Sequence, residues 1–259
     1  SYIYGASKKG KLIQMTNKTN TYNMMNKTFT PSAQLKSLNV EFSNKAQLGR
    51  PVDPNSKRQQ RLATAPGKKT GRPITALVVM HTFGHPCQLS DLRNLADEYG
   101  LPLIEDAAEA LGSFYDDKHV GHWGDITCLS FNGNKVITTG GGGAILTPHK
   151  NLAERAKHLT TTAKVPHQWE YKHDEVGYNF RLPNINAALG CAQLEYLHKK
   201  KKKKQKLAQH YARCFEEITD VRFVSPSSRT NSNYWLNSII LKSESREDRD
   251  HLLKITNAS

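Results

Sequence analysis

A strand–helix–strand rhythm that starts near residue 74 restricts this chain to a small set of folds. Residues 74–80 (ITALVVM) form a continuous apolar run rich in β-branched side chains, which is typical of a strand covered on both faces. Residues 87–99 carry apolar side chains at helical spacing, and Gly100 is a helix stop. Residues 101–106 then form a short apolar strand that ends at two acids. This order predicts parallel βαβ units and therefore a layered α/β domain.

The rest of the chain predicts a continuation of this domain and a second, smaller unit. Helices are expected over residues 151–162, where Asn151 is a candidate cap, from Pro183 into the lysine run at 199–204, and from about Arg246. We expect the lysine run to be a solvated stretch of its helix, because a nucleic-acid site would interleave aromatic residues. Further strands are expected at residues 125–132, 142–148, 221–228 and 233–242.

Residues 1–72 differ in composition from everything that follows. They are rich in Asn, Ser, Thr, Lys and Gln and show no sustained period, so we expect a divergent, poorly ordered, basic segment. The first 75 residues carry 14 Lys or Arg and two acids, whereas the whole chain has a net charge of +14. The positive charge therefore says little about the partners of the remainder. We place the cofactor-binding core at 73–205 and the start of a shortened, small C-terminal domain at 206–259.

The compartment can be argued from two patterns. The chain has no run of 18 apolar residues, and its N-terminus lacks the charged-then-apolar order of a signal peptide. The four cysteines are far apart and form no CxxC pair, which favours reduced thiols. We therefore expect a cytoplasmic protein that binds neither a membrane nor a nucleic acid, and we find no set of residues with metal-ligand spacing.

Two predicted strands end in chemically useful groups. One ends at Asp106 and the other ends shortly before Lys135, and sites in open α/β sheets form at the carboxyl ends of strands. A lysine amine there could form a Schiff base, and a nearby carboxylate could pair with a pyridinium nitrogen. Residues 140–143 are four glycines that let backbone approach a bulky ligand, and Ser130 could bind a phosphate. Taken singly, these residues also have ordinary interpretations as a surface lysine, a helix cap and a flexible turn.

Four blocks resemble, in order and spacing, the DegT/DnrJ family of sugar-nucleotide aminotransferases: HTFGHP, PLIEDAAEALGS, GDITCLSFNGNKVITTGGGGAI and VGYNFRLPNINAALGCAQLE. The resemblance covers about residues 70–240 and looks closest to the branch that makes 4-amino-6-deoxy-N-acetylhexosamines of the legionaminic-acid type. It implies the three-layer, mainly parallel α/β sheet of the fold type I aminotransferases, with a partial small C-terminal α+β domain. It also implies pyridoxal 5'-phosphate as cofactor, glutamate as amino donor, and the 4-keto carbon of a UDP-linked 6-deoxy-N-acetylhexosamine as acceptor.

The resemblance implies a role for each matching residue. Lys135 would hold pyridoxal phosphate through a Schiff base and then move the proton between the cofactor and C4 of the sugar. Asp106 would pair with the pyridine nitrogen, Glu109 would lie against the ring or its O3′, and Ser130 would bind the phosphate. Asn179 would reach the phosphate of the other subunit's cofactor, which implies a homodimer with shared active sites.

Other conspicuous side chains are assigned by their surroundings. His85 follows a predicted strand end in a loop and is a candidate for the sugar pocket. Trp123, Trp169 and Trp235 are expected to be packing residues or loop anchors rather than substrate platforms.

The chain also departs from the family. Family members carry a Gly-Ser/Thr-Ala turn that binds the cofactor phosphate before the lysine, and residues 1–72 contain no such turn. We therefore expect weak cofactor retention unless a partner chain fills the gap. Two alternatives stay open: a truncated, catalytically inactive relative, and a basic protein that binds polyanions through residues 1–72.

Overall fold

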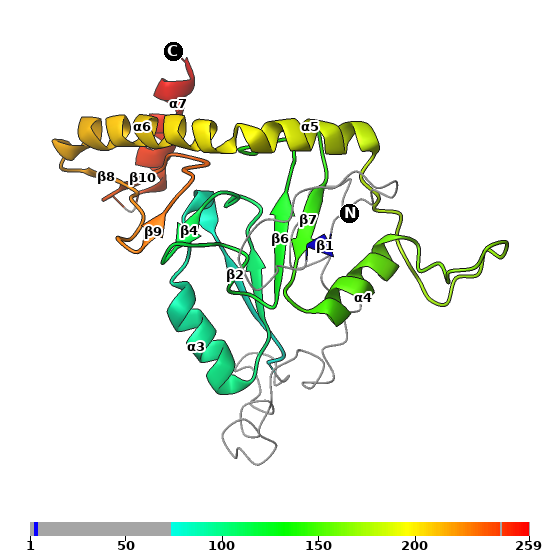
Figure 1. Cartoon of the computed structure of the whole chain (residues 1–259). Coiled ribbons are helices and arrows are strands. Elements are labelled where there is room, and N and C mark those ends of the chain that lie inside the picture. The colour runs from blue at the N-terminus through cyan, green and yellow to red at the C-terminus, as the bar shows by residue number, and fades with distance from the viewer. Residues whose placement is uncertain (1–2, 5–73, 244, 259) are drawn as a thin grey trace.

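A mixed five-stranded sheet forms the centre of the molecule (Figure 1). A computed structural model describes residues 3–4, 74–243 and 245–258, so the prediction for residues 1–72 lies outside the described residues apart from Ile3 and Tyr4. The strand order is β1-β7-β6-β3-β2, and every neighbouring pair is parallel except β6 and β7. The five strands are β1 (Ile3–Tyr4), β2 (Leu77–Met80), β3 (Leu103–Asp106), β6 (Ile126–Ser130) and β7 (Gly143–Leu146).

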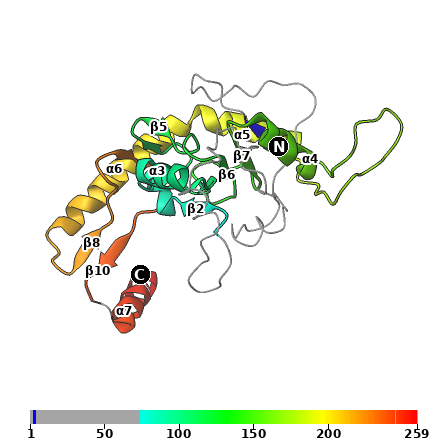
Figure 2. The ribbon, with the colours of Figure 1, turned by 90° about the horizontal axis from the view of Figure 1, so that it is seen from below.

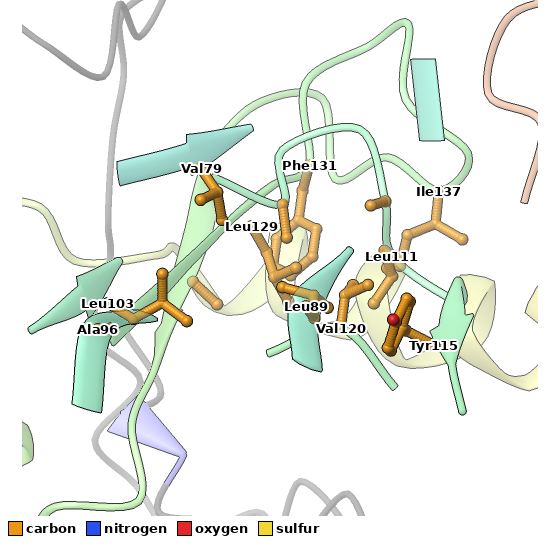
Figure 3. Close-up of a cluster of buried hydrophobic side chains, with 13 residues drawn as sticks. Val79, Leu89, Ala96, Leu103, Leu111, Tyr115, Val120, Leu129, Phe131 and Ile137 are labelled. Carbon is orange, nitrogen blue, oxygen red and sulfur yellow. The ribbon is translucent and has the colours of Figure 1, made fainter. Parts of the chain in front are cut away.

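The two faces of this sheet are covered by different helices, which confirms the predicted layered, mainly parallel α/β fold. Helix α3 (Leu89–Tyr99) packs on one face, against the cluster drawn in Figure 3. Helix α4 (Lys150–Thr160) packs on the other face, where Ile126 and Ile145 contact Leu152 and Ala156. Alternation along the strands separates the two sets of side chains. The cluster on the α3 side includes Val79, Leu89, Ala96, Leu103, Leu129, Phe131 and Ala144.

The helix boundaries lie within two residues of the predicted ones, except that Asn151 is not a cap and the predicted long helix is divided at Tyr196. Gly100 ends α3 in the left-handed conformation with φ of 61°, as its place in the sequence predicts. Asn151 does not cap α4, because the helix begins at Lys150 with His149 at the N-cap position. His149 is fixed there because its Nε2 lies 3.1 Å from Asp125 Oδ1. This contact with Asp125, rather than a side-chain cap at Asn151, holds the residue that precedes the helix.

The prediction that residues 74–80 are covered on both faces is wrong. Strand β2 lies at the edge of the sheet and starts at Leu77. Val79 is buried, but Val78 and Met80 are 49% and 52% exposed. Helix α4 covers the strands at the opposite edge, so it does not reach the second face of β2. The apolar run at residues 74–80 therefore predicted a strand correctly, but it did not predict that only one face of the strand is covered.

Two consecutive helices lie across the ends of the sheet strands (Figure 1). Figure 1 shows α5 (Asn184–Glu195) and α6 (Leu197–Glu216) as a nearly continuous rod, where the sequence predicted one long helix. Gly190 of α5 packs so closely that a Cβ would lie 2.9 Å from Thr139 Cγ2, which explains the glycine inside the helix. The lysine run is only partly solvated, because Lys201 Nζ donates to the Gly112 carbonyl at 2.7 Å. Burial lowers the pKa of Lys201 to about 8.

The C-terminal part adds one strand to the main domain and forms a small sheet of its own. Strand β9 (Thr230–Asn231) pairs with β4 (Phe114–Tyr115), which also pairs with β5 (Lys118–His119). Strands β8 (Val221–Phe223) and β10 (Ile239–Leu241) form an antiparallel pair beside α6. Helix α7 (Arg246–Ala258) follows at a distance from the main sheet, as Figure 2 shows from below. In the described part of the chain, every helix is too short or too polar to cross a bilayer.

Candidate active site

Three parallel strands have their carboxyl ends on the same side of the sheet, which is called the site edge below, and bring the predicted residues together there. Strands β2, β3 and β6 run in the same direction, so the residues after Met80, Asp106 and Ser130 meet at their carboxyl ends. The loop between β6 and antiparallel β7 starts and ends at this edge and carries Lys135. Gly140 and Gly142 in this loop have φ of 81° and 91°, which glycine adopts readily.

The amine of Lys135 is held between a carboxylate and an aromatic face. Its Nζ lies 3.9 Å from Glu109 Oε1 and 4.0 Å from the centroid of the Trp235 ring. The side chain is 13% exposed, which is unusual for a lysine. Burial lowers the pKa of Lys135, although the Glu109 and Asp106 carboxylates act in the opposite direction. Lys135 is therefore not the solvated surface lysine that a single residue of this type would suggest.

Asp106 is the last residue of β3 and faces the same edge. Burial raises the pKa of this carboxyl, while the Ala108 N–H, His81 and Lys135 oppose the rise. The Ala108 N–H donates to Oδ1 at 3.1 Å, and among the described residues Oδ2 has no hydrogen-bond donor. The residues that follow form turns, so Asp106 is not the cap of a helix. One oxygen of a largely buried carboxylate remains available to a cationic N–H group.

Glu109 and Ser130 flank Lys135 and Asp106 with polar groups. Glu109 Oε2 accepts the Phe83 N–H at 2.7 Å, so its carboxylate is held between this amide and the lysine. Ser130 ends β6, and its Oγ accepts the Asn132 N–H at 3.3 Å. That bond uses the oxygen as an acceptor and leaves the hydroxyl proton free to be donated to an anion.

Two predicted residues lie outside this immediate group. Asn179 forms a backbone bridge with Thr161, and its Oδ1 accepts a hydrogen bond from Arg181 at 3.1 Å. Within the described residues, Asn179 has no recorded contact with Lys135 or Asp106. His85 packs edge-on against Tyr234, with ring centroids 5.3 Å apart. Its two ring nitrogens are buried without a hydrogen-bond partner among the described residues, and burial lowers the pKa of the ring.

Two further groups at this edge were not assigned to the site by the sequence analysis. Trp235 anchors a loop, as expected, because its indole N–H donates to the Asn134 carbonyl at 2.8 Å, but it also covers the lysine amine. His81 Nε2 pairs with Glu105 Oε2 at 3.0 Å, and both side chains are fully buried. The backbone N–H of His81 also donates to the Asp106 backbone carbonyl at 3.0 Å. The sequence separation of 100 residues leaves no local pattern from which the contact between Trp235 and Lys135 could be predicted.

Comparisons with known proteins give one family match and several relatives. A family model described as the DegT/DnrJ/EryC1/StrS aminotransferase family matches residues 59–259. GDP-perosamine synthase of Escherichia coli O157:H7 is 37% identical over 203 residues, which are 78% of this chain and 55% of that protein. The UDP-4-amino-4,6-dideoxy-N-acetyl-beta-L-altrosamine transaminase of Campylobacter jejuni is 36% identical over 150 residues, 58% of this chain and 40% of that protein.

A solved structure is similar over the same part of the fold. Helicobacter pylori PseC, an aminotransferase involved in the biosynthesis of pseudoaminic acid, superposes with a TM-score of 0.69 at 25% identity. The match covers 77% of this chain and 53% of that one. The chain thus spans about half the length of the curated relatives it matches.

Proposed function

Because this chain belongs to the DegT/DnrJ/EryC1/StrS aminotransferase family, we propose that it acts as a pyridoxal-phosphate-dependent sugar-nucleotide aminotransferase. One observation carries the proposal. Asp106 ends β3, and Lys135 lies in the loop that follows the adjacent parallel strand β6, so the half-buried amine and the carboxylate lie at the same end of the sheet. A shielded amine and a carboxylate in one place are the two protein groups that this chemistry requires.

The residues at this edge fit the cofactor by the chemistry of their donor and acceptor groups. Lys135 would bind its carbonyl carbon, the free oxygen of Asp106 would accept the pyridine N–H, and Ser130 Oγ would donate to the phosphate. Pyridoxal phosphate, when bound, supplies the electron sink for breaking a C–H bond next to nitrogen. Lys135 would then hold and return that proton, because its lowered pKa keeps a larger share of the amine unprotonated. Glu109 would lie beside the ring and hold the lysine amine at its place.

The substrates are proposed from the relatives and from one orphaned side chain. Glutamate would supply the amino group, and the acceptor would be the 4-keto carbon of a UDP-linked 6-deoxy-N-acetylhexosamine. The Campylobacter relative named for a UDP-linked sugar supports this choice, and the Escherichia relative named for a GDP-linked sugar makes the GDP sugar the natural comparison. His85 would contact the sugar, because its buried ring nitrogens lack a protein partner among the described residues.

Lys135→Ala is the variant that tests the function most directly. The chain would be incubated with pyridoxal phosphate, reduced with borohydride and mapped by peptide mass, and then assayed with glutamate and each 4-keto sugar. We expect a reduced adduct on Lys135 and loss of all measurable turnover in Lys135→Ala. Lys150→Ala is the matched control, because that lysine is 89% exposed and should leave both results unchanged.

Two outcomes would replace the proposal. Folded, soluble protein without an adduct on Lys135 would identify an inactive relative. Turnover that survives in Lys135→Ala would rule out a mechanism through this lysine. Binding of polyanions that weakens steeply with salt and requires residues 1–72 would instead favour the basic binding protein.

A further inference from the structure

Trp235 reaches the lysine amine from the C-terminal part of the chain. The Nζ of Lys135 lies over the indole face, 4.0 Å from its centroid, while the indole N–H donates to the carbonyl of Asn134, the neighbour of the lysine. Trp235 thus contacts both the side chain that would react and the backbone that carries it. A ring face at this distance attracts an ammonium group.

One buried side chain ties Trp235 to the other neighbour of the lysine. Asn233 is fully buried, and its Oδ1 accepts the backbone N–H of Trp235 at 2.8 Å. Its Nδ2 donates to the Glu109 carbonyl at 2.8 Å and to the Leu111 carbonyl at 2.9 Å. Asn233 therefore bonds to the backbones of both residues whose side chains lie near the Lys135 amine. A buried amide with all these bonds made is costly to displace.

The surrounding backbone is shaped to admit this asparagine. Gly84 is buried with φ of 88°, and a Cβ there would overlap the amide oxygen of Asn233. The Gly84 carbonyl accepts the hydroxyls of Ser113 and Ser232, each at 2.8 Å. Tyr234 adopts φ of 48°, a strained value for a residue with a Cβ. These features fix the segment 232–236 in place against the site.

We propose that Trp235 is a positioning residue for Lys135: with Asn233 as its anchor, its indole face holds the lysine amine beside Glu109 at the carboxyl end of the sheet. The inference deepens the proposed function and rests on it only for the identity of Lys135 as the reacting group. A purely structural tryptophan would stabilise the fold but would leave the charge and reactivity of the lysine unchanged.

The test compares Trp235→Phe with Trp235→Leu in the full chain without cofactor. The two replacements have similar size and both lose the indole N–H, but only phenylalanine presents a ring face to the amine. Competitive acetylation across pH, followed by peptide mass, gives the apparent pKa of each lysine, with the exposed Lys150 as internal reference. We expect the pKa of Lys135 to be lower in Trp235→Leu than in Trp235→Phe by roughly half a unit. Trp169→Leu, at a side chain that is 76% exposed, should match the wild type.

The result that would overturn the inference is an identical Lys135 titration in the wild type, Trp235→Phe and Trp235→Leu. Circular dichroism would show whether Trp235→Leu is folded. If it is not, a chain with Trp123→Phe and Trp169→Phe, in which Trp235 is the remaining tryptophan, provides the test through its fluorescence emission. That emission should titrate with Lys135, and the titration should vanish after Lys135→Ala; persistence of the same titration would contradict the contact. An adduct on Lys135 without the Phe–Leu difference would leave the proposed function standing and remove only the role of Trp235. A Phe–Leu difference in the pKa of Lys135 without any adduct would keep the role of Trp235 and remove the proposed function.

Discussion

At the scale of single residues, the charge of the Lys135 amine depends on neighbours that oppose one another. Burial favours the neutral amine, whereas the carboxylates of Glu109 and Asp106 favour the ammonium form. The face of Trp235 acts in the same direction as the carboxylates. A lysine that attacks a carbonyl and then carries a proton needs a pKa at which both the neutral amine and the ammonium form are accessible.

Glu109→Gln tests the carboxylate in this balance. The amide removes the charge 3.9 Å from Lys135 Nζ but keeps an oxygen that can accept the Phe83 N–H. We expect the pKa of Lys135 to fall by up to about 0.7 unit, because a partly exposed ion pair contributes at most about 1 kcal/mol and one pKa unit corresponds to about 1.4 kcal/mol. Competitive acetylation measures it, and Glu154→Gln, which removes the exposed partner of Lys150, is the control. An unchanged or raised pKa of Lys135 would contradict this account.

At the scale of secondary-structure elements, β3 places two neighbouring acids on opposite faces for different tasks. Asp106 points to the site, whereas Glu105 is fully buried on the α3 side. The Glu105 carboxylate accepts the N–H groups of Gly121, Trp123 and Gly124 as well as the pair with His81. Burial alone would raise the pKa of Glu105, but these bonds and the charge of His81 hold it below its usual value. The strand end that carries Asp106 is fixed by this cluster.

The lowered pKa of Glu105 predicts acid sensitivity of the fold. A carboxyl with a depressed folded pKa contributes stability that is present above its ordinary value of 4.5 and is lost as pH falls through the folded value. We expect the free energy of unfolding, measured in urea, to decrease below pH 4.5. Glu105→Gln should cost about 3–5 kcal/mol at neutral pH, because it leaves a buried partner uncompensated, and should show a smaller further loss in acid. An equally steep acid loss in that variant would assign the effect to other carboxyls.

At the scale of the whole molecule, the site is assembled from parts that are distant in the sequence. Strand β9 returns from the C-terminal region to pair with β4, and this return carries Asn233 and Trp235 to Lys135. Asn179 lies apart from this group, near Thr161 and Arg181. We propose that Asn179 serves the site of a second copy of the chain, which is the role that the family resemblance implies.

A mixing experiment tests the shared site. Lys135→Ala and Asn179→Ala would each lower activity alone, but a mixed dimer would contain one site with an intact lysine and an intact asparagine. Co-expressed variants should recover about a quarter of wild-type activity, the statistical value for one intact site in half of the dimers. As a control, Lys135→Ala would also be co-expressed with the double variant Lys150→Ala, Asn179→Ala. The same recovery is expected, because Lys150 is exposed. Mixtures no more active than the separate variants would place Asn179 outside a shared site.

The sequence by itself determined the α/β class and most element positions, and it predicted Asp106 and Lys135, which the structure places at the same end of the sheet. Hydrophobic periodicity and glycine stops act over a few residues, so they identify β3, α3, β6 and the loop of Lys135 directly. Only the tertiary structure decided that β2 has an open face, that His149 starts α4, and that Trp235 covers the lysine amine. These features depend on contacts between segments up to 100 residues apart, and the energy of such contacts is not encoded in any local pattern.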